Sequence, residues 1–230
     1  MDRVAKLPLA HQPGAAWTYG ISHDVLGRLI EVVSGMRFDA FLQERIFEPL
    51  GMVDTGFVVP AENLARLATV YAPDESGGLR RSGAPGLDRS EPRAFLSGGG
   101  GLVSTAGDYA QFCQMLLNGG TLGGTRVLGA KTIELMTATQ MPRDQIPFVP
   151  ATWPFRHGYG MALGVRTLID VAQSGIPGTA GTYTWQGAAG TDFWIDPAEE
   201  LFGILLIQVL PGPHRPGEVL RVLTYQALDE

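Results

Sequence analysis

The chain has 230 residues, of which 45% are hydrophobic and 17% charged, a balance typical of a globular protein. Its net charge of -6 excludes the basic surface that nucleic-acid binding needs, so we expect no nucleic-acid partner. The longest apolar run, 201–210, is too short to span a bilayer, and the first residues lack the apolar core of a signal peptide. We therefore expect no membrane span and a cytoplasmic location.

The first part of the chain, 1–158, is predicted to be mostly helical with long loops. Apolar residues recur at helical spacing over 22–34, with Ser22 as the predicted N-cap and Gly35 as the residue that ends the helix. Further helices are predicted at 38–47, 105–118 and 130–138. Thr105 and Asp108 have the spacing of a capping box. The stretch 53–97 shows no clear period, which is typical of a functional surface loop or a mobile excursion.

The second part, 159–230, is predicted to be a portion of an antiparallel sheet with a C-terminal helix. Strands are predicted at 160–168, 182–186, 191–195 and 201–209, and a helix at 218–228. The last strand is continuously apolar, which indicates that both of its faces are covered. Helices followed by antiparallel strands are typical of the α+β class. We expect the two parts to belong to one domain.

Few residue patterns point to a metal or a cofactor. The four histidines are scattered and Cys113 is the single cysteine, so we expect no metal and no cofactor. Cys113 lies in a helical apolar pattern and is predicted to be a core residue. Asp192 and Asp196 are predicted to be solvated turn carboxylates. The glycine run 98–101 lacks the features of a phosphate-binding loop and is predicted to allow a close backbone approach.

Two aromatic residues each allow two interpretations. Tyr19 lies on a loop just before a helix, so it is either a packing residue, which local chemistry favours, or a catalytic proton carrier. Trp185 ends a strand and is followed by Gly187, where backbone N–H groups could approach a ligand and donate to an oxyanion. The alternative, also favoured locally, is that Trp185 packs on the sheet and Gly187 serves the turn.

Four sequence blocks occur in order along the chain: PGAAWTYGISHDVLGRLIEVVSG, IFEPLGMVDTGF, SGGGGLVSTAGDYAQFCQMLLNGG and WQGAAGTDFWIDPAEELFGILLIQ. Together they resemble the serine β-lactamase-related family, which includes class C β-lactamases, family VIII carboxylesterases, DD-peptidases and related acyltransferases. The resemblance covers nearly the whole chain. It implies a β-lactamase/transpeptidase-like fold and an acyl-enzyme mechanism that acts on a small ester or amide substrate.

The resemblance also implies roles for particular residues. Tyr19 would carry the proton to and from the nucleophile, and Ala188 would offer its backbone N–H to the oxyanion. Trp185 and Gly187 would line the substrate site on the strand where many members have Lys-Thr-Gly. Because Trp185 replaces that lysine and Ile21 stands in place of a family asparagine, the resemblance favours esters or acyl transfer over β-lactams.

The family's Ser-x-x-Lys element is missing, because none of the eight serines is followed by lysine three residues later. The chain therefore resembles a C-terminal portion of such a hydrolase, with an incomplete fold. We expect negligible hydrolysis by the chain alone, since such catalytic units are strongly non-additive, and its status as an enzyme stays open. An open sheet edge would favour self-association or a partner chain that completes the sheet. The alternative to a hydrolase portion is a non-catalytic binding module that uses this edge.

Overall fold

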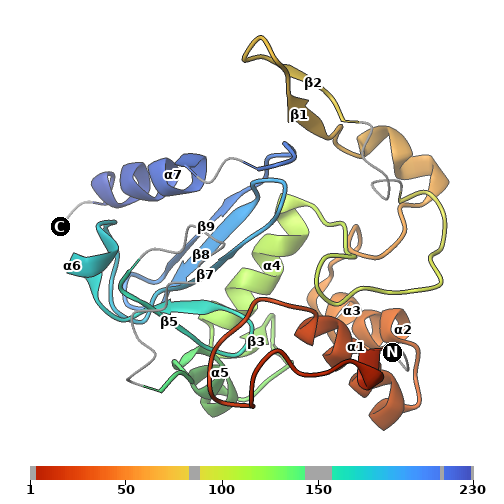
Figure 1. Cartoon of the computed structure of the whole chain (residues 1–230), viewed down its shortest axis with the longest axis horizontal. Coiled ribbons are helices and arrows are strands. Elements are labelled where there is room, and N and C mark those ends of the chain that lie inside the picture. The colour runs from red at the N-terminus through yellow and green to blue at the C-terminus, as the bar shows by residue number, and fades with distance from the viewer. Residues whose placement is uncertain (1–3, 83–88, 143–156, 213–214, 229–230) are drawn as a thin grey trace.

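The computed structural model describes residues 4–82, 89–142, 157–212 and 215–228 (Figure 1). Two of its short helices, η1 and η3, are 3-10 helices, and η2 is a π-helix. The elements in chain order are η1 (Val4–Lys6), α1 (Ser22–Ser34), α2 (Phe38–Leu42), η2 (Gln43–Phe47), α3 (Glu48–Leu50), η3 (Ala61–Arg66), β1 (Tyr71–Pro73), β2 (Leu79–Arg81), α4 (Ala106–Leu117), β3 (Thr121–Leu122), β4 (Thr125–Arg126), α5 (Ala130–Thr137), β5 (Tyr159–Met161), β6 (Arg166–Leu168), α6 (Val171–Ser174), β7 (Tyr183–Gln186), β8 (Asp192–Asp196), β9 (Leu201–Leu205) and α7 (Arg215–Gln226).

The main sheet is a five-stranded antiparallel meander in the order β5-β6-β7-β8-β9. The predicted strand 160–168 is wrong in one respect: it is a hairpin of two strands, because the Ala162 N–H donates to the Val165 carbonyl and closes a turn. The last strand ends at Leu205 rather than at 209. The chain there leaves the sheet, and Gln208 accepts a hydrogen bond from the Tyr71 N–H of β1 instead.

The main core lies between the sheet and the helices on one of its faces. Figure 1 shows α4 along one face and α7 along the other, and both helices contact β9, as its apolar sequence predicts. Cys113 is fully buried in this core, as predicted. The buried members of the core are Phe47, Leu50, Met52, Cys113, Met115, Leu116, Ile133, Tyr183 and Ile195.

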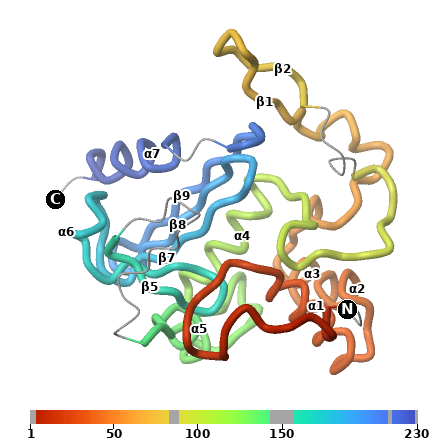
Figure 2. Tube along the Cα trace, in the orientation of Figure 1, coloured from red at the N-terminus to blue at the C-terminus, as the bar shows by residue number. Residues whose placement is uncertain are grey.

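The stretch 53–97 contains more regular structure than its sequence indicates. It holds η3 and the β1–β2 hairpin, which projects from the body of the molecule (Figure 2). Main-chain hydrogen bonds to Gln208 and Leu210 tie Tyr71, the first residue of that hairpin, to the chain after β9. No helix among the described residues is long and apolar enough to cross a bilayer.

Helix α1 has the predicted bounds but not the predicted cap. Ile21 is the N-cap residue and makes no side-chain cap hydrogen bond, whereas Ser22 is already helical. Gly35 ends the helix in the left-handed conformation, with φ of 70°, as predicted. The apolar residues of α1 point outward: Val25, Leu29 and Val33 are 46%, 52% and 79% exposed.

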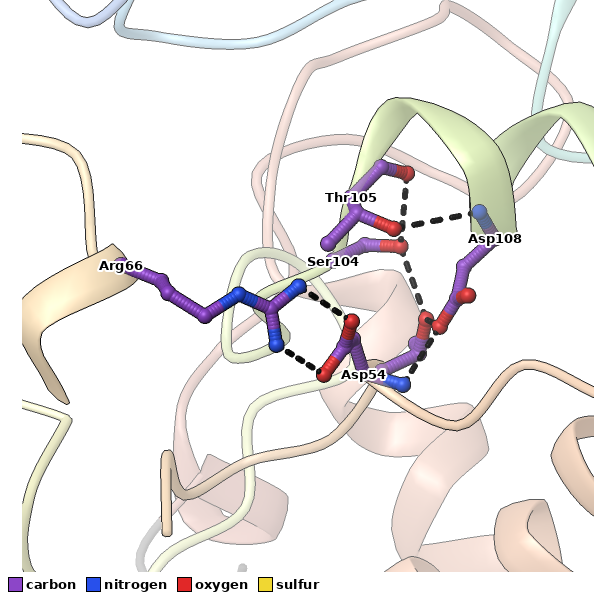
Figure 3. A network of polar contacts seen from close by, with 6 residues as sticks. Asp54, Arg66, Ser104, Thr105 and Asp108 are labelled. Atoms are coloured by element: carbon purple, nitrogen blue, oxygen red, sulfur yellow. Dashed lines mark hydrogen bonds and ion pairs between the residues drawn. The ribbon is translucent and has the colours of Figure 1, made fainter. Parts of the chain in front are cut away.

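A polar network joins the loop before Thr55 to the start of α4 (Figure 3). Thr105 caps α4 as predicted, because its hydroxyl accepts from the Asp108 N–H at 3.2 Å. The buried Asp108 carboxylate accepts from the Asp54 N–H at 2.7 Å and from the Thr55 hydroxyl at 2.8 Å. Arg66 makes a two-pronged ion pair with Asp54. The network therefore links two of the four sequence blocks.

Replacing Asp108 with alanine should lower the free energy of unfolding by about 2–3 kcal/mol, because the Asp54 N–H and the Thr55 hydroxyl would lose a charged acceptor. Urea unfolding monitored by circular dichroism measures this change. Glu134→Ala is the matched control, since Glu134 forms an exposed ion pair with Lys131 on α5, and it should leave stability nearly unchanged. Equal effects of the two substitutions would contradict this account of the network.

The prediction for the two carboxylates of β8 is wrong. Asp192 and Asp196 are buried. They lie two residues before and two residues after the fully buried Trp194, so all three side chains share the face of β8 that α7 covers. Asp196 accepts hydrogen bonds from the Tyr225 hydroxyl at 2.5 Å and from the Thr182 hydroxyl at 2.9 Å. The two-residue period of a strand is the sequence signal that could have placed Asp192 and Asp196 on the same face as Trp194.

We expect the Asp196 carboxyl to contribute to the free energy of unfolding in a way that depends on pH. Burial acts to raise its pKa, but hydrogen bonds from Tyr225, Thr182 and two backbone N–H groups outweigh burial and hold the pKa below its ordinary value. A carboxyl with a lowered folded-state pKa stabilises the fold above the unfolded-state pKa of about 3.9, and this stabilisation is lost as the pH falls through the folded-state pKa.

Tyr225→Phe removes one of these donors and should lower the free energy of unfolding at pH 7 by about 1–2 kcal/mol. The deficit should narrow as the pH falls below about 4, because the protonated carboxyl no longer needs the donor as strongly. Urea titrations at neutral and acidic pH measure both values. A deficit of the same size at every pH would contradict the assignment to Asp196.

Candidate active site

The structure brings together Tyr19 from the first sequence block and Trp185 from the last one. Their rings are stacked, with centroids 6.4 Å apart and planes within 3° of parallel. The Trp17 ring also lies close to Tyr19, with ring centroids 6.3 Å apart and planes tilted by 54°. Trp17 and Trp185 both pack against the buried Met161 of β5. Tyr19 itself is 47% exposed, so its ring lies against an aromatic wall at the surface.

The Tyr19 loop is held by contacts on both of its sides. Ahead of Tyr19, the His11 ring and the Thr18 hydroxyl are joined by a hydrogen bond of 2.9 Å. Behind it, the Asp24 carboxylate on the first turn of α1 accepts from the Ser97 hydroxyl at 2.6 Å. These contacts position the loop between the sheet and the start of α1, where an exposed side chain can be held rigidly.

The glycine run 98–101 makes a close backbone approach, as predicted. A Cβ atom on Gly98 would lie 2.4 Å from the His23 carbonyl oxygen, so only glycine fits there. The approach places Ser97 beside Asp24 rather than beside the His23 ring. No hydrogen bond joins Ser97 to His23, so these two residues do not form a serine–histidine pair.

The turn after β7 contains the predicted oxyanion donor. Gly187 serves the turn, because a Cβ atom there would lie 2.1 Å from the Thr191 hydroxyl oxygen. Ala188 is exposed, and its carbonyl accepts from the Gly212 N–H at 2.8 Å. Within the described residues the Ala188 N–H donates to no carbonyl or side chain. The hydrogen bond from Gly212 therefore fixes the turn through the Ala188 carbonyl, while the Ala188 N–H could still donate to a ligand.

A buried charged cluster supports β7 from the face under α7. The Gln186 side chain donates to Asp192 at 2.9 Å, and Thr184 donates to the other carboxylate oxygen at 3.3 Å. Arg221 of α7 donates to the Thr184 hydroxyl at 3.1 Å and to the Tyr159 hydroxyl at 3.0 Å. Burial raises the pKa of Asp192, and the Gln186 hydrogen bond and the Arg221 charge oppose that rise. The cluster thus holds the strand that carries Trp185.

Cys113 and the acidic and histidine side chains are the further candidates for reactive or metal-binding groups. Burial raises the pKa of the Cys113 thiol to about 12, so it is not a thiolate at neutral pH. Among the described residues, no group of three or more His, Cys, Asp or Glu side chains is placed to hold a metal ion. The described contacts place the Tyr19 ring against Trp185, and the predicted backbone donor Ala188 lies on the turn that follows the strand of Trp185.

Comparison with models of known families shows to which family the chain belongs. A family model described as Beta-lactamase matches residues 1–226 of the chain. The chain belongs to the β-lactamase family. The order of the four sequence blocks therefore predicted both the family and its β-lactamase/transpeptidase-like fold.

Curated proteins with similar sequences include two esterases. Esterase EstB of Burkholderia gladioli is 31% identical over 223 residues, which cover 90% of this chain and 53% of EstB. A lovastatin esterase of Penicillium rubens is 32% identical, with 92% of this chain and 55% of that protein covered. An uncharacterised protein of Mycobacterium tuberculosis is 39% identical, with 90% and 52% covered. The chain spans about half the length of the curated relatives it matches.

A solved structure shows the same fold. It is described as EstCE1, a hydrolase with promiscuous acyltransferase activity, and it matches with a TM-score of 0.82 at 24% identity. The match covers 96% of this chain and 59% of that one.

Sequence reasoning missed several residues around the site. Trp17 lies two residues before Tyr19 and could have been grouped with it as part of one aromatic patch. Met161 and Arg221 gave no local signal, because each acts through a contact with a distant segment.

Proposed function

We propose that this chain is the tyrosine-bearing portion of an esterase-like serine hydrolase, and that the nucleophilic serine is supplied by polypeptide outside it. The observation that carries the proposal is the stack of Tyr19 on Trp185, which joins the proton carrier to the strand that binds the substrate. In this proposal Tyr19 and Ala188 act on the reacting atoms, while Trp185 and Gly187 line the substrate site.

The proposed reaction follows acyl-enzyme chemistry. The deprotonated oxygen of Tyr19 accepts the proton of the serine hydroxyl as the serine attacks the ester carbonyl. The resulting phenol then gives that proton to the departing alcohol, which restores the deprotonated form. The Ala188 N–H donates to the oxygen that becomes negatively charged. Water then attacks the acyl-enzyme carbonyl, Tyr19 takes its proton and passes it to the departing serine oxygen, and the acid is released. The cluster behind β7 keeps the strand and its donor in place through Gln186.

The aromatic wall favours an ester over a charged substrate. Trp17, Tyr19 and Trp185 present ring surfaces, which suit an apolar acyl or alcohol group. Trp185 provides no positive charge for a substrate carboxylate. The names of two relatives, an esterase and a lovastatin esterase, support the same substrate class.

A chromogenic ester assay tests the proposal. The purified chain should hydrolyse 4-nitrophenyl butyrate no faster than buffer does, and it should show no burst of nitrophenol. Co-expression with a polypeptide that carries Ser-x-x-Lys from an esterase of the family should produce turnover. Turnover by the chain alone that Tyr19→Phe abolishes would contradict the proposal.

The second candidate is a non-catalytic binding module. The exposed apolar residues of α1 favour an interaction role of some kind. An octameric penicillin-binding protein homologue of Pyrococcus abyssi, 20% identical, shares the fold. Light scattering of the purified chain separates the candidates, because a stable oligomer that no Ser-x-x-Lys polypeptide activates would favour the binding module.

A further inference from the structure

The turn at residues 187–190 sets the direction in which the Ala188 N–H points. Across this turn the Gly187 carbonyl accepts a hydrogen bond from the Gly190 N–H at 3.0 Å. The Gly187 carbonyl and the Ala188 N–H belong to one trans peptide bond, which holds them on opposite sides of a single plane. The Ala188 N–H therefore points away from the Gly190 side of the turn.

The segment after β9 holds the two central residues of this turn. We call residues 208–212 the strap. Its Val209 N–H donates to the Ala189 carbonyl at 3.0 Å, and its Gly212 N–H donates to the Ala188 carbonyl at 2.8 Å. The strap thus binds the two carbonyls that follow the Ala188 N–H along the chain, so the orientation of these peptide groups depends on the strap.

Gly212 is the residue at which the strap and the turn are in closest contact. A Cβ atom on Gly212 would overlap the Gly190 nitrogen and would lie 2.7 Å from the Ala189 carbonyl carbon, and both of these atoms are main-chain atoms that cannot rotate away. The φ angle of Gly212 is not in the left-handed region, so its own conformation does not require glycine. The missing side chain is therefore needed for the contact with the turn.

The other side of the strap is bonded to β1. The Tyr71 N–H donates to the Gln208 carbonyl at 2.8 Å, and the Leu210 N–H donates to the Tyr71 carbonyl at 2.7 Å. These bonds use main-chain groups of Tyr71 and not its hydroxyl. At the start of the turn, the Gly187 N–H donates to the Thr191 carbonyl at 2.8 Å. The turn is therefore fixed at its base by β8 and at its centre by a strap that is itself held on both sides.

We propose that Gly212 is a positioning residue for the oxyanion donor: its N–H and its bare backbone hold the turn so that the Ala188 N–H points toward the substrate. This inference rests on the proposed function, in which the Ala188 N–H donates to the oxyanion, and adds to it a residue that acts through Ala188. An oxyanion donor is effective only at about 2.7–3.1 Å from the position of the charged oxygen. A side chain at position 212 would push the turn away from the strap and displace this donor.

Gly212→Ala tests the proposal with the smallest change, because it adds one methyl group at the contact and keeps the N–H. Amide hydrogen exchange of the nitrogen-15-labelled chain, followed by NMR, reports on the turn without a second polypeptide. The Gly190 amide should lose at least about tenfold of its protection and the Ala188 amide signal should shift, while the amides of β8 keep their protection. Gly107→Ala is the matched control, because the nearest atom to its Cβ would be the Thr105 hydroxyl oxygen at 3.9 Å. It should change neither signal.

The catalytic readout is the separate measurement of kcat and KM in an assembled enzyme, formed by this chain and a polypeptide that supplies Ser-x-x-Lys. Gly212→Ala should lower the kcat for 4-nitrophenyl butyrate by at least about tenfold, because loss of a whole oxyanion donor costs about 100- to 1,000-fold. KM should stay nearly unchanged, since the donor acts on the charge that develops in the transition state. Gly107→Ala should leave both constants unchanged.

Two results would overturn the proposal: unchanged Gly190 and Ala188 amides in Gly212→Ala, or a kcat equal to that of the control. Val209→Pro replaces Gly212→Ala if circular dichroism shows that the latter is unfolded, because it removes the strap N–H that donates to Ala189 and should loosen the same Gly190 amide. Absence of turnover in every assembled enzyme would refute the proposed function, and the exchange measurement would then still decide whether Gly212 positions the Ala188 N–H.

Discussion

Replacing Arg221 with methionine should lower the free energy of unfolding by about 3–5 kcal/mol. Arg221 is buried and donates to the hydroxyls of Tyr159 and Thr184, and its guanidinium lies 5.1 Å from the centre of the Trp194 ring. Without it, these hydroxyls lose a charged donor, and the buried Asp192 carboxylate loses one of the two arginine charges, Arg221 and Arg166, that oppose the rise of its pKa. Removing one member of a buried charge cluster costs far more than removing an exposed ion pair.

Urea unfolding of the purified variant measures the effect. Arg45→Met is the matched control, because Arg45 forms an ion pair with Glu44 in which both side chains are more than half exposed. The control should leave stability nearly unchanged. If Arg221→Met cost no more than the control, the cluster would not be the support of β7 that the structure indicates.

Tyr19→Phe should lower the kcat of an assembled enzyme by about 100- to 10,000-fold, which is the usual contribution of a general acid–base residue. The assembled enzyme is this chain together with a polypeptide that supplies Ser-x-x-Lys. Phenylalanine keeps the ring that stacks on Trp185 and removes only the hydroxyl, so the loop should stay in place. Steady-state hydrolysis of 4-nitrophenyl butyrate gives kcat and KM separately.

The control for Tyr19 is Tyr71→Phe. Tyr71 lies on the projecting β1–β2 hairpin and is 38% exposed, so the loss of its hydroxyl should leave kcat unchanged. A Tyr19→Phe enzyme that keeps a third or more of the activity would show that Tyr19 is a packing residue, the interpretation that its local sequence favours.

Much of the fold followed from local patterns. The bounds of α1 and α4, the Thr105 cap, the close approach at Gly98 and the burial of Cys113 agree with the sequence, because each depends on spacing or side-chain size within one segment. Family membership followed from the order of four blocks.

The sidedness of the helices could not be predicted in the same way. Apolar spacing identifies an amphipathic helix but does not say which side faces the rest of the chain, and α1 turns its glycine and carboxylates inward. Helix α7 does the same, with Arg221 buried and Leu223 56% exposed. Composition rules likewise placed Asp192 in solvent, whereas donors from β7 and the charge on α7 make its burial tolerable.

The candidate site could be predicted only in part, because some of its features depend on local sequence patterns and others on packing between distant segments. Tyr19 and Trp185 were each picked out by a local pattern, and the family resemblance gave them roles. Their stacking depends on the packing of the Tyr19 loop against Met161 and β7, which no local pattern describes.

The central claim, that the chain carries the tyrosine side of a serine hydrolase site and not its nucleophile, is tested most directly by covalent labelling. A fluorophosphonate probe reacts with activated serine hydroxyls, and intact-mass spectrometry shows where it is attached. The account predicts that the chain alone keeps its unmodified mass and that, in the assembled enzyme, the label is on the Ser-x-x-Lys polypeptide. One equivalent of label on a serine of this chain, lost in Tyr19→Phe, would contradict it.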